Sequence, residues 1–397
     1  MRFAIQRGLG TEWRMAAAFF VAGFGTFALI YDIQPLLPEF TTCFGVSAAT
    51  ASLALSLTTL SLSAAMLAAG RLSELVDRRR MMSASIMLGG LASILCALAP
   101  GWGAFLALRA LLGAALGGLP AVALAYISDN APPARLAGMV GLYVSGTAFG
   151  GMAGRLLGGF ITSASQDWRH TVAGIGALCL LAGALFHLAL PRTDNRGAVP
   201  PPSDSAASLR VLAKRFAAQW RDPVLRALFI EGALLLGCFV ATFNYLCFRL
   251  AHAPYNYSHE QVSLVFLMNL LGMVVSPLCG RIIARHGLAA TLRGSFLLTV
   301  AGCALSQLDS LFFLLAGCAL GTVGFFAGHS TATAWVNRHA RDGRAIASAQ
   351  YLTTYYIGAS LLGWLGGWAW QWAGWAGVCG MVAAAALTAV ALTPGNE

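Results

Sequence analysis

Hydrophobic runs of membrane length follow one another along almost the whole chain of 397 residues, separated by short polar stretches. A helix needs about 20 mostly apolar residues to cross a bilayer. Twelve runs come close to or exceed that length, at 14–37, 48–70, 81–99, 103–127, 136–162, 170–190, 224–249, 259–280, 289–307, 310–334, 344–367 and 372–392. The pattern predicts an all-α membrane protein with twelve transmembrane helices.

The longest polar stretch lies in the middle of the chain, from Pro191 to Arg221, and contains three consecutive prolines and a Ser/Ala/Asp tract. Such a composition is typical of a linker rather than a domain. We therefore expect an N-terminal six-helix bundle over 1–190, a cytoplasmic linker over 191–222 and a C-terminal six-helix bundle over 223–397.

The two halves also repeat a short pattern at the same place. Gly70 and Arg71 end the second hydrophobic run, and Gly280 and Arg281 end the eighth. Two pseudo-symmetric six-helix bundles are the architecture that an alternating-access transporter requires.

Composition supports a lipid environment. Only 10% of residues are charged and the mean hydropathy is +0.72, whereas a soluble domain carries about 25% charged residues. Too few charges are present to build a water-facing surface, so the lipid bilayer is the expected surrounding medium. The length does not indicate several soluble domains.

Basic residues indicate the orientation. With the N-terminus inside, 21 of the 25 Lys and Arg fall in the terminal and loop segments on that side, as expected for cytoplasmic loops. Both termini are therefore expected in the cytoplasm. The formal charge of +10 is spread between hydrophobic runs and forms no basic, aromatic-interleaved patch, so no nucleic-acid partner is expected.

The sequence lacks the common motifs for nucleotide binding, metal binding and nucleophilic catalysis. The sequence contains no GxxxxGK[ST], HExxH, GxSxG or CxxC, so we expect no cofactor, no metal ion and no direct use of ATP. A membrane-embedded enzyme, the alternative from another class, needs acid, base or metal-ligand residues clustered at one interface. The polar groups within the hydrophobic runs are sparse and spread over both halves, so the chain is not expected to be an enzyme.

Residues 70–80 read GRLSELVDRRR and are similar to the loop between spans two and three of major facilitator transporters, Gly-x-Leu-x-Asp-Arg-x-Gly-Arg-Arg. Glu74 stands where the family usually has Asp, and Asp77 where it usually has Gly. Arg78 and Arg79 keep the basic end. Residues 280–287, GRIIARHG, are a weaker copy in the second half. The resemblance implies a gate or conformational role for Gly70, Glu74, Asp77, Arg78, Arg79, Gly280 and Arg281.

Further strings extend the resemblance over essentially the whole chain. Arg109 followed by glycines resembles the family's fourth span, and GLYVSGTAFGG at 141–151 its exporters' fifth-span glycine motif, with Thr147 in place of a proline. QPLLPEF, GGMAGRLLGGF, FNYLCFRL and GHSTATAWV look like YnfM-type bacterial inner-membrane transporters of the drug and sugar exporter branch. This resemblance implies the major facilitator (MFS) fold, an inner-membrane location and a monomer.

Three ionisable residues lie at one depth in the first half. Asp32, Arg109 and Arg155 each lie about 8 to 10 Å from the outer end of a span. An ionisable group within a membrane is costly and is a functional candidate. Asp32 is expected to carry a coupling proton, while an Arg binds substrate or resets the Asp. The alternatives are a structural ion pair, or an Asp wetted by periplasmic water.

The second half offers an inner layer. Glu231 and His329 lie near the inner ends of their spans, and an inner-layer pair between them is one possible arrangement; both are proton-coupling candidates because His titrates near neutral pH. A backbone hydrogen bond is the simpler role for His329. Substrate-cavity candidates provide amide and aromatic surface, with polar helix packing as the alternative. They are Arg109, Arg155, Asn244, Tyr245, Asn269, Gln350, Tyr351 and Tyr355.

Glycines recur at small-residue spacing in the fifth span, including Gly146, Gly150 and Gly151. They favour close helix contacts, either as a surface that slides between the halves or as static packing. Together these features predict a proton-coupled exporter of a small organic compound. The alternative transporter is an importer of an organic anion, because the outer layer holds two Arg against one Asp.

Overall fold

The computed structural model describes residues 9–190, 214, 216–340 and 343–395, and every regular element in them is a helix. Eleven helical segments of this described part are long and apolar enough to cross a membrane. The last one runs over 47 residues, Ile346–Leu392. Its backbone leaves the helical region at Ala373 and Gly374, which divides it into two segments. The prediction of an all-α protein with twelve crossings is confirmed.

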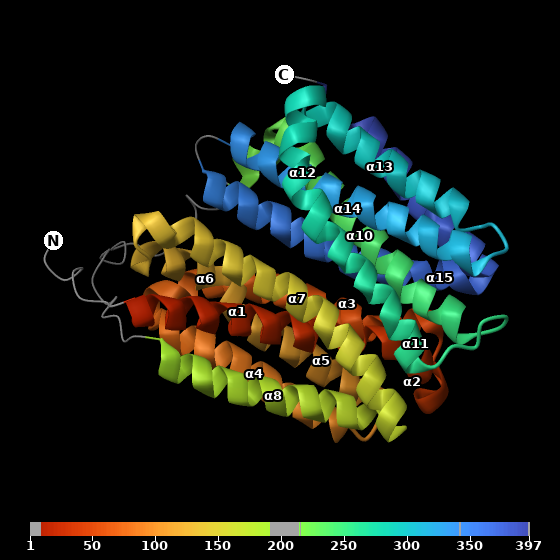
Figure 1. The fold of residues 1–397 in the computed structure, drawn as a ribbon, viewed down its shortest axis with the longest axis horizontal. Coiled ribbons are helices and arrows are strands. Elements are labelled where there is room, and N and C mark those ends of the chain that lie inside the picture. Colours follow the sequence, from red (N-terminus) through yellow and green to blue (C-terminus); the bar gives the residue numbers. More distant parts are fainter. Residues whose placement is uncertain (1–8, 191–213, 215, 341–342, 396–397) are drawn as a thin grey trace, which may run out of the picture. The chain divides into compact units, whose positions relative to one another are not determined.

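The chain divides into two compact units, and the first comprises Met1–Leu36 and Leu60–Pro200. Figure 1 shows α1 lying beside α7 and α4 beside α8 in this unit. Its elements are α1 (Leu9–Tyr31), η1 (Gln34–Leu36), the later part of α3 (Ala48–Leu75), α4 (Arg78–Ala97), α5 (Trp102–Leu116), α6 (Gly118–Asn130), α7 (Pro133–Ser165) and α8 (Trp168–Ala189).

The second unit comprises Leu37–Thr59 and Pro201–Glu397. Here α10 packs on α15, and α13 on α14. Its elements are α2 (Leu37–Phe44), the start of α3, α10 (Pro223–Ala251), α11 (His259–Ser263), η2 (Leu264–Leu270), α12 (Leu271–His286), α13 (Leu288–Leu305), α14 (Leu311–His339) and α15 (Arg344–Leu392).

The start of α3 belongs to the second unit because it is tied to α15. Ser56 Oγ donates to the Ser360 carbonyl at 2.9 Å, and Ser360 Oγ donates to the Ser56 carbonyl at 2.8 Å. The sequence gives no hint of this reciprocal bond. The expected linker over 191–222 lies mostly outside the described residues.

Short polar residues set the helix starts. The side chains of Asp77, Asp167, Asp222 and Ser310 accept hydrogen bonds from the first free backbone amides of α4, α8, α10 and α14, which is the standard N-cap arrangement. Near the end of α1, Pro35 has no backbone N–H to donate to the carbonyl of Tyr31, four residues earlier. The helix ends at Tyr31, and a short 3-10 turn follows.

The fifth-span glycines pack within one unit. A Cβ on Gly146 or Gly150 would collide with the backbone of Phe20 or Phe24 on α1, and one on Gly158 would meet the Asp32 carbonyl. These glycines recur every four residues, so they form one groove along α7 into which α1 fits. In this structure Gly146 and Gly150 thus lie against α1 of their own unit, the arrangement that static packing requires.

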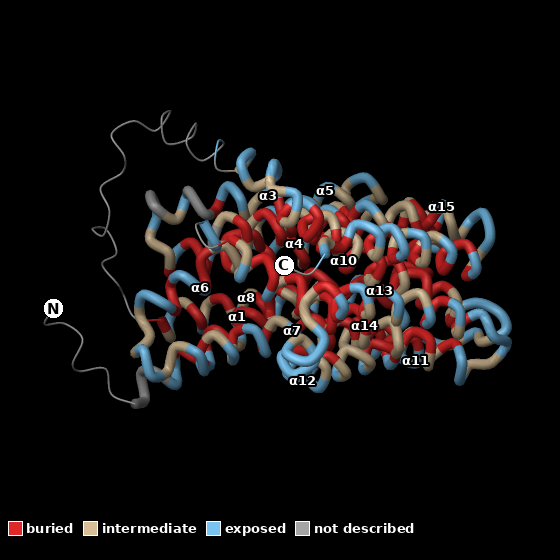
Figure 2. The backbone as a smooth tube through the Cα atoms, turned by 90° about the horizontal axis from the view of Figure 1, so that it is seen from above, coloured by how far each residue is buried: buried red, intermediate tan, exposed pale blue. Residues whose placement is uncertain are grey.

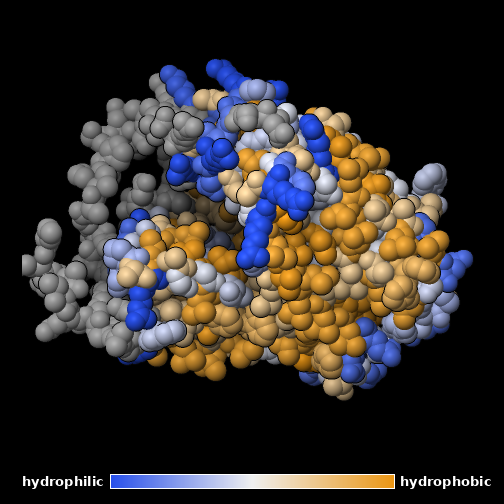
Figure 3. All heavy atoms as spheres, turned by 45° about the horizontal axis from the view of Figure 1, so that its top comes forward, coloured by the Kyte–Doolittle hydropathy of each residue, from blue (hydrophilic) through white to orange (hydrophobic). Residues whose placement is uncertain are grey.

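Buried residues lie where helices of a unit face one another, as the red segments in Figure 2 show. Much of the face drawn in Figure 3 is hydrophobic. Large apolar side chains are exposed on many helices, for example Leu188 and Phe312, both 71% exposed, and Trp372, 87% exposed. Such an apolar exterior is suited to lipid rather than water.

Candidate functional site

The first unit holds a cluster of polar side chains where α1 ends, called here the outer charged cluster. It consists of Tyr31, Asp32, Gln34, Arg109 and Arg155, all at most 6% exposed. The break after α1 supplies Asp32 and Gln34, α5 supplies Arg109 and α7 supplies Arg155. The three charges expected at one depth are therefore brought together.

Arg109 caps the end of α1. Its Nη2 donates to the Ile30 carbonyl at 2.8 Å, and its Nη1 lies 3.2 Å from the Leu29 carbonyl and 3.3 Å from Asp32 Oδ1. The last carbonyls of a helix lack partners within the helix and attract positive charge. Asp32 thus forms an ion pair with Arg109, and both side chains are fully buried.

Arg155 is held beside this pair. Its Nε donates to Gln34 Oε1, its Nη1 donates to the Gly151 carbonyl at 2.7 Å, and its guanidinium carbon lies 3.8 Å from the centre of the Tyr31 ring. The ring contact is a cation–π interaction. Tyr31 and Gln34 were missed as site residues, although both flank Asp32 in the sequence.

The Asp32 carboxylate is less completely bonded than its partner. Its Oδ1 meets Arg109, the backbone amide of Ile33 also interacts with the carboxylate, and Oδ2 makes no hydrogen bond within the described residues. A buried carboxylate needs compensation. Because Arg109 has two carbonyl acceptors besides Asp32, it can keep its position when the charge of Asp32 changes.

Glu231 and His329 have separate partners, so the possible pair between them is absent from the contacts of the described residues. Glu231, fully buried on α10, accepts from Thr393 Oγ1 at 2.5 Å, and Arg293 is close enough to interact with it electrostatically. Its Oε2 makes no hydrogen bond in the described part of the chain. Thr393 follows the end of α15, a position that pairing arguments restricted to spans overlook.

His329 belongs instead to a set of nearly parallel rings, called here the aromatic column: Phe239, Phe325, His329, Tyr351 and Tyr355. His329 Nδ1 lies 3.1 Å from the Tyr351 hydroxyl, and its ring centre is 4.8 Å from that of Tyr355. Helices α10, α14 and α15 each contribute to the column. Two of the predicted cavity residues, Tyr351 and Tyr355, are thus joined to a predicted proton site.

The other cavity candidates of the second unit are dispersed. Tyr245 donates its hydroxyl to the Gly363 carbonyl at 2.8 Å, and the neighbouring Asn244 is buried. Gln350 Nε2 donates to Gln219 Oε1 at 2.6 Å. Asn269 lies on η2, half-buried.

The loop motif of the first half anchors helix ends. Asp77 caps α4, Arg78 forms an ion pair with Asp129 at the end of α6 at 2.6 Å, and both Nε and Nη2 of Arg79 donate to the His187 carbonyl near the end of α8. The side chains at Gly70 and Glu74 lie outside the described residues. In the second-half copy, Gly280 has open space around it and Arg281 is exposed.

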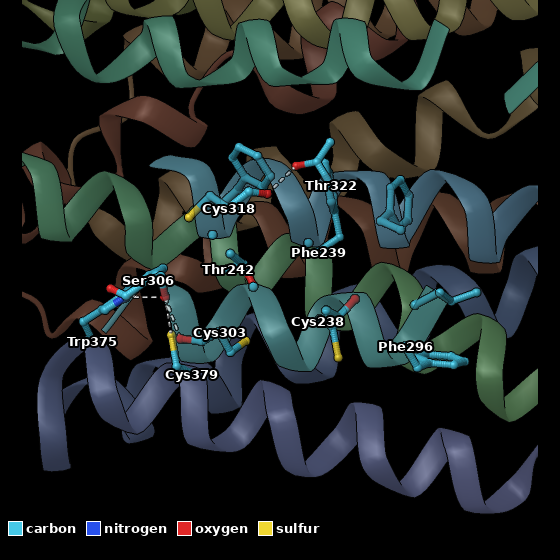
Figure 4. A pocket seen from close by; sticks show the side chains of 17 residues that line it. Cys238, Phe239, Thr242, Phe296, Cys303, Ser306, Cys318, Thr322, Trp375 and Cys379 are labelled. Atoms are coloured by element: carbon cyan, nitrogen blue, oxygen red, sulfur yellow. Dashed lines mark hydrogen bonds between the residues drawn. The ribbon is translucent and has the colours of Figure 1, made fainter. Parts of the chain in front are cut away.

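A cavity lies inside the second unit among α10, α13, α14 and α15 (Figure 4). It offers about 30 Å³ for the centres of water molecules, room for a water molecule or two. Aromatic rings, thiols and hydroxyls line it, and its lining contains no charged side chain. The described residues contain no group of three or more His, Cys, Asp or Glu that could hold a metal ion.

Comparisons with known proteins place these features in a family. A model described as Major Facilitator Superfamily matches residues 15–362. An uncharacterised MFS-type transporter of Bacillus subtilis (strain 168), YybF, is 36% identical over 98% of this chain and 95% of its own length. The inner membrane transport protein YnfM of Escherichia coli (strain K12) is 36% identical over 96% of this chain and 89% of its own.

Solved structures agree on the fold. The nucleoside transporter NupG superposes with a TM-score of 0.72 at 15% identity, over 96% of this chain and 100% of its own. A bacterial homologue of the human lysosomal transporter Spinster, in an inward-facing and unoccupied conformation, gives 0.74 at 15% identity, over 97% of this chain and 95% of its own.

Proposed function

Because this chain belongs to the Major Facilitator Superfamily and is a multi-pass secondary transporter rather than an enzyme, we propose that it is a proton-coupled exporter of a small organic compound. It works by alternating access, with Asp32 as the residue that carries the coupling proton. No cofactor takes part, and the substrate is a small molecule.

The outer charged cluster carries this proposal. Asp32 is a fully buried carboxylate whose ion-pair contact to Arg109, at 3.3 Å, is longer than the 2.8 Å bond from Arg109 to Ile30. Protonation of Asp32 therefore gives up one long contact and leaves Arg109 bound to the end of α1. A carboxylate with these properties can change its charge during a cycle without dismantling its surroundings.

The coupling follows from competition for one layer. When Asp32 is ionised, the positive charges of Arg109 and Arg155 offset the negative charge of its carboxylate. When Asp32 takes a proton, its negative charge is lost, and the affinity of the layer for a hydrogen-bond-donating or positively charged group of the substrate falls. Proton and substrate would then bias the same equilibrium between conformations, which is what coupling requires.

Transport in proteoliposomes tests the proposal. Purified full-length protein is reconstituted and assayed against a compound panel, with and without an imposed pH gradient. We expect at least one small organic compound to move faster when the gradient is present, and its outward movement to be driven by inward proton movement. Transport that ignores the gradient for every transported compound would contradict proton coupling.

A proton-coupled importer of an organic anion is the second candidate. Two arginines and one aspartate meet in the outer charged cluster, a balance that favours an anionic group. The same panel separates the two functions, because an importer accumulates anions in the direction of proton entry, whereas an exporter exchanges substrate against protons.

We also propose a bacterial inner-membrane location with both termini in the cytoplasm. The basic residues of the loops support this orientation, and the relative YnfM is described as an inner membrane protein. Reporter fusions at Asp204 and at Glu397 are expected to give cytoplasmic signals. A periplasmic signal at either position would overturn the twelve-span scheme.

A further inference from the structure

We infer that the aromatic column in the second unit binds an uncharged, planar aromatic or heteroaromatic molecule. This inference rests on the proposed transport function, since it names the chemical class of the substrate.

The rings of the column are close to parallel. Phe239 and Phe325 are stacked with centres 4.1 Å apart and planes at 22°, and Phe325 and His329 are 6.0 Å apart at 12°. His329 and Tyr355 lie 4.8 Å apart at 35°. The pair of Phe325 with His329 is an offset stack, a geometry that aromatic rings favour. Five rings from three helices with similar orientation form a surface that matches a flat molecule.

Two rings of the column remain partly accessible. Phe239 and His329 are half-buried, while Tyr351 and Tyr355 are buried. Tyr351 fixes the His329 ring through the Nδ1 hydrogen bond. The other ring nitrogen, Nε2, makes no hydrogen bond with the described residues, so it offers one directional hydrogen bond at the edge of the stack.

The cavity of Figure 4 lies next to the same rings. Phe239 and Phe325 belong to its lining, together with Phe243, Phe296 and Trp375. Interiors are normally close-packed. Free space beside Phe239 and Phe325 gives these two rings room to shift when a ligand ring stacks on them.

Charge decides between a neutral and a cationic ligand. The cavity lining and the rings of the column contain no carboxylate, and the charge of the nearby acid Glu231 is offset by Arg293. Removing a cation from water without a counter-charge is costly. A neutral ring with a hydrogen-bonding edge therefore fits this surface better than a planar cation.

Acridone, a neutral, planar and fluorescent heteroaromatic compound, is a direct probe, and proflavine is a planar cation of the same size. Binding is measured by fluorescence anisotropy with the full-length protein in lipid nanodiscs, with empty nanodiscs as the blank. We expect acridone to bind more tightly than proflavine.

Two phenylalanines give a matched pair of variants. Phe239→Leu removes a ring of the column, whereas Phe326→Leu removes a half-buried neighbour whose plane is at 70° to Phe239 and 68° to Phe325. We expect Phe239→Leu to weaken acridone binding roughly 3- to 10-fold, the range of one aromatic contact, and Phe326→Leu to leave it unchanged. His329→Gln should weaken binding similarly, and His329→Phe, which keeps a ring, should weaken it less.

Equal affinity for acridone in Phe239→Leu and Phe326→Leu, or tighter binding of proflavine than of acridone by the wild-type protein, would overturn the inference. Thermal unfolding of each variant shows whether it is folded. If Phe239→Leu does not fold, His329→Gln and His329→Phe test the column independently. A protein that transports other compounds but does not bind acridone contradicts only this inference. One that binds acridone but transports nothing contradicts only the proposed function.

Discussion

Asp32 Oδ1 lies 3.3 Å from Nη1 of Arg109, and neither side chain is exposed. The two residues differ in how firmly they are held. Arg109 is also bonded to the carbonyls of Leu29 and Ile30, whereas Asp32 Oδ2 makes no hydrogen bond in the described chain. Arg109 is therefore the fixed member of the pair, and Asp32 is the member whose protonation can change.

Removal of Arg109 should destabilise the protein strongly. Arg109→Met leaves Asp32 without its ion-pair partner and two helix carbonyls without a donor. We expect a loss of about 3 to 5 kcal/mol in unfolding free energy, the range for breaking a buried pair. Thermal unfolding in detergent measures it.

The double variant Asp32→Asn/Arg109→Met is the control for this charge effect. It should lose less than the sum of the two single variants, because no uncompensated carboxylate remains. Losses that simply add would show that the two side chains contribute independently.

The groove on α7 predicts a second stability difference. Gly150→Ala places a methyl group against the Phe24 backbone, and overpacking of this kind typically costs about 1 to 3 kcal/mol. Gly141→Ala on the same helix is the control, because it meets nothing within 4 Å and alanine is the better helix former. Equal unfolding temperatures for the two variants would argue against a tight contact between α1 and α7.

Much of this molecule follows from its sequence. Helix positions are set by apolar runs of membrane length, and they are predicted to within a few residues, as for 48–70 against Ala48–Ala69. That Asp32 meets Arg109 or Arg155 was also predictable, because all three lie at one depth in a medium that cannot solvate them; residue depth alone does not choose Arg109 over Arg155. Depth along a helix is readable from residue counting alone.

Direction around a helix is harder to predict. Glu231 and His329 lie at similar depths, yet Glu231 meets Thr393 and His329 meets Tyr351. The rotation of each helix depends on packing with several neighbours at once, which a single sequence does not specify. For the same reason the sequence does not predict that Gln34 is the partner of Arg155, or that Ser56 and Ser360 bond to each other.

Asp222, just before α10, should make stability depend on acid pH. Burial raises the pKa of Asp222, but hydrogen bonds from the Leu225 amide and from His339 outweigh it, so the net pKa lies below 3.8. A lowered folded-state pKa contributes stability above the unfolded pKa of about 3.9, and this contribution is lost as the pH falls through the folded-state value.

Thermal unfolding between pH 7 and about pH 3 checks this contribution. The wild-type unfolding temperature should fall more than that of Asp222→Asn, since asparagine still caps the helix but does not titrate. Parallel curves for the two proteins would assign the acid sensitivity to other groups.

Glu231 provides the comparison for the proton-coupling role. Glu231→Gln can still accept the hydrogen bond from Thr393 but cannot ionise. If Asp32 alone carries the proton, we expect Glu231→Gln to keep a transport rate that responds to an imposed pH gradient. Proteoliposome assays at several gradients measure this response. Loss of the response in Glu231→Gln would place a coupling proton in the second unit.

The most direct test is gradient-driven transport by Asp32→Asn in proteoliposomes, compared with substrate exchange in the absence of a gradient. The account predicts that exchange continues in this variant, because Arg109 remains bound to the end of α1, while an imposed pH gradient no longer accelerates transport. A wild-type response to the gradient in Asp32→Asn would contradict the assignment of Asp32 as the proton carrier.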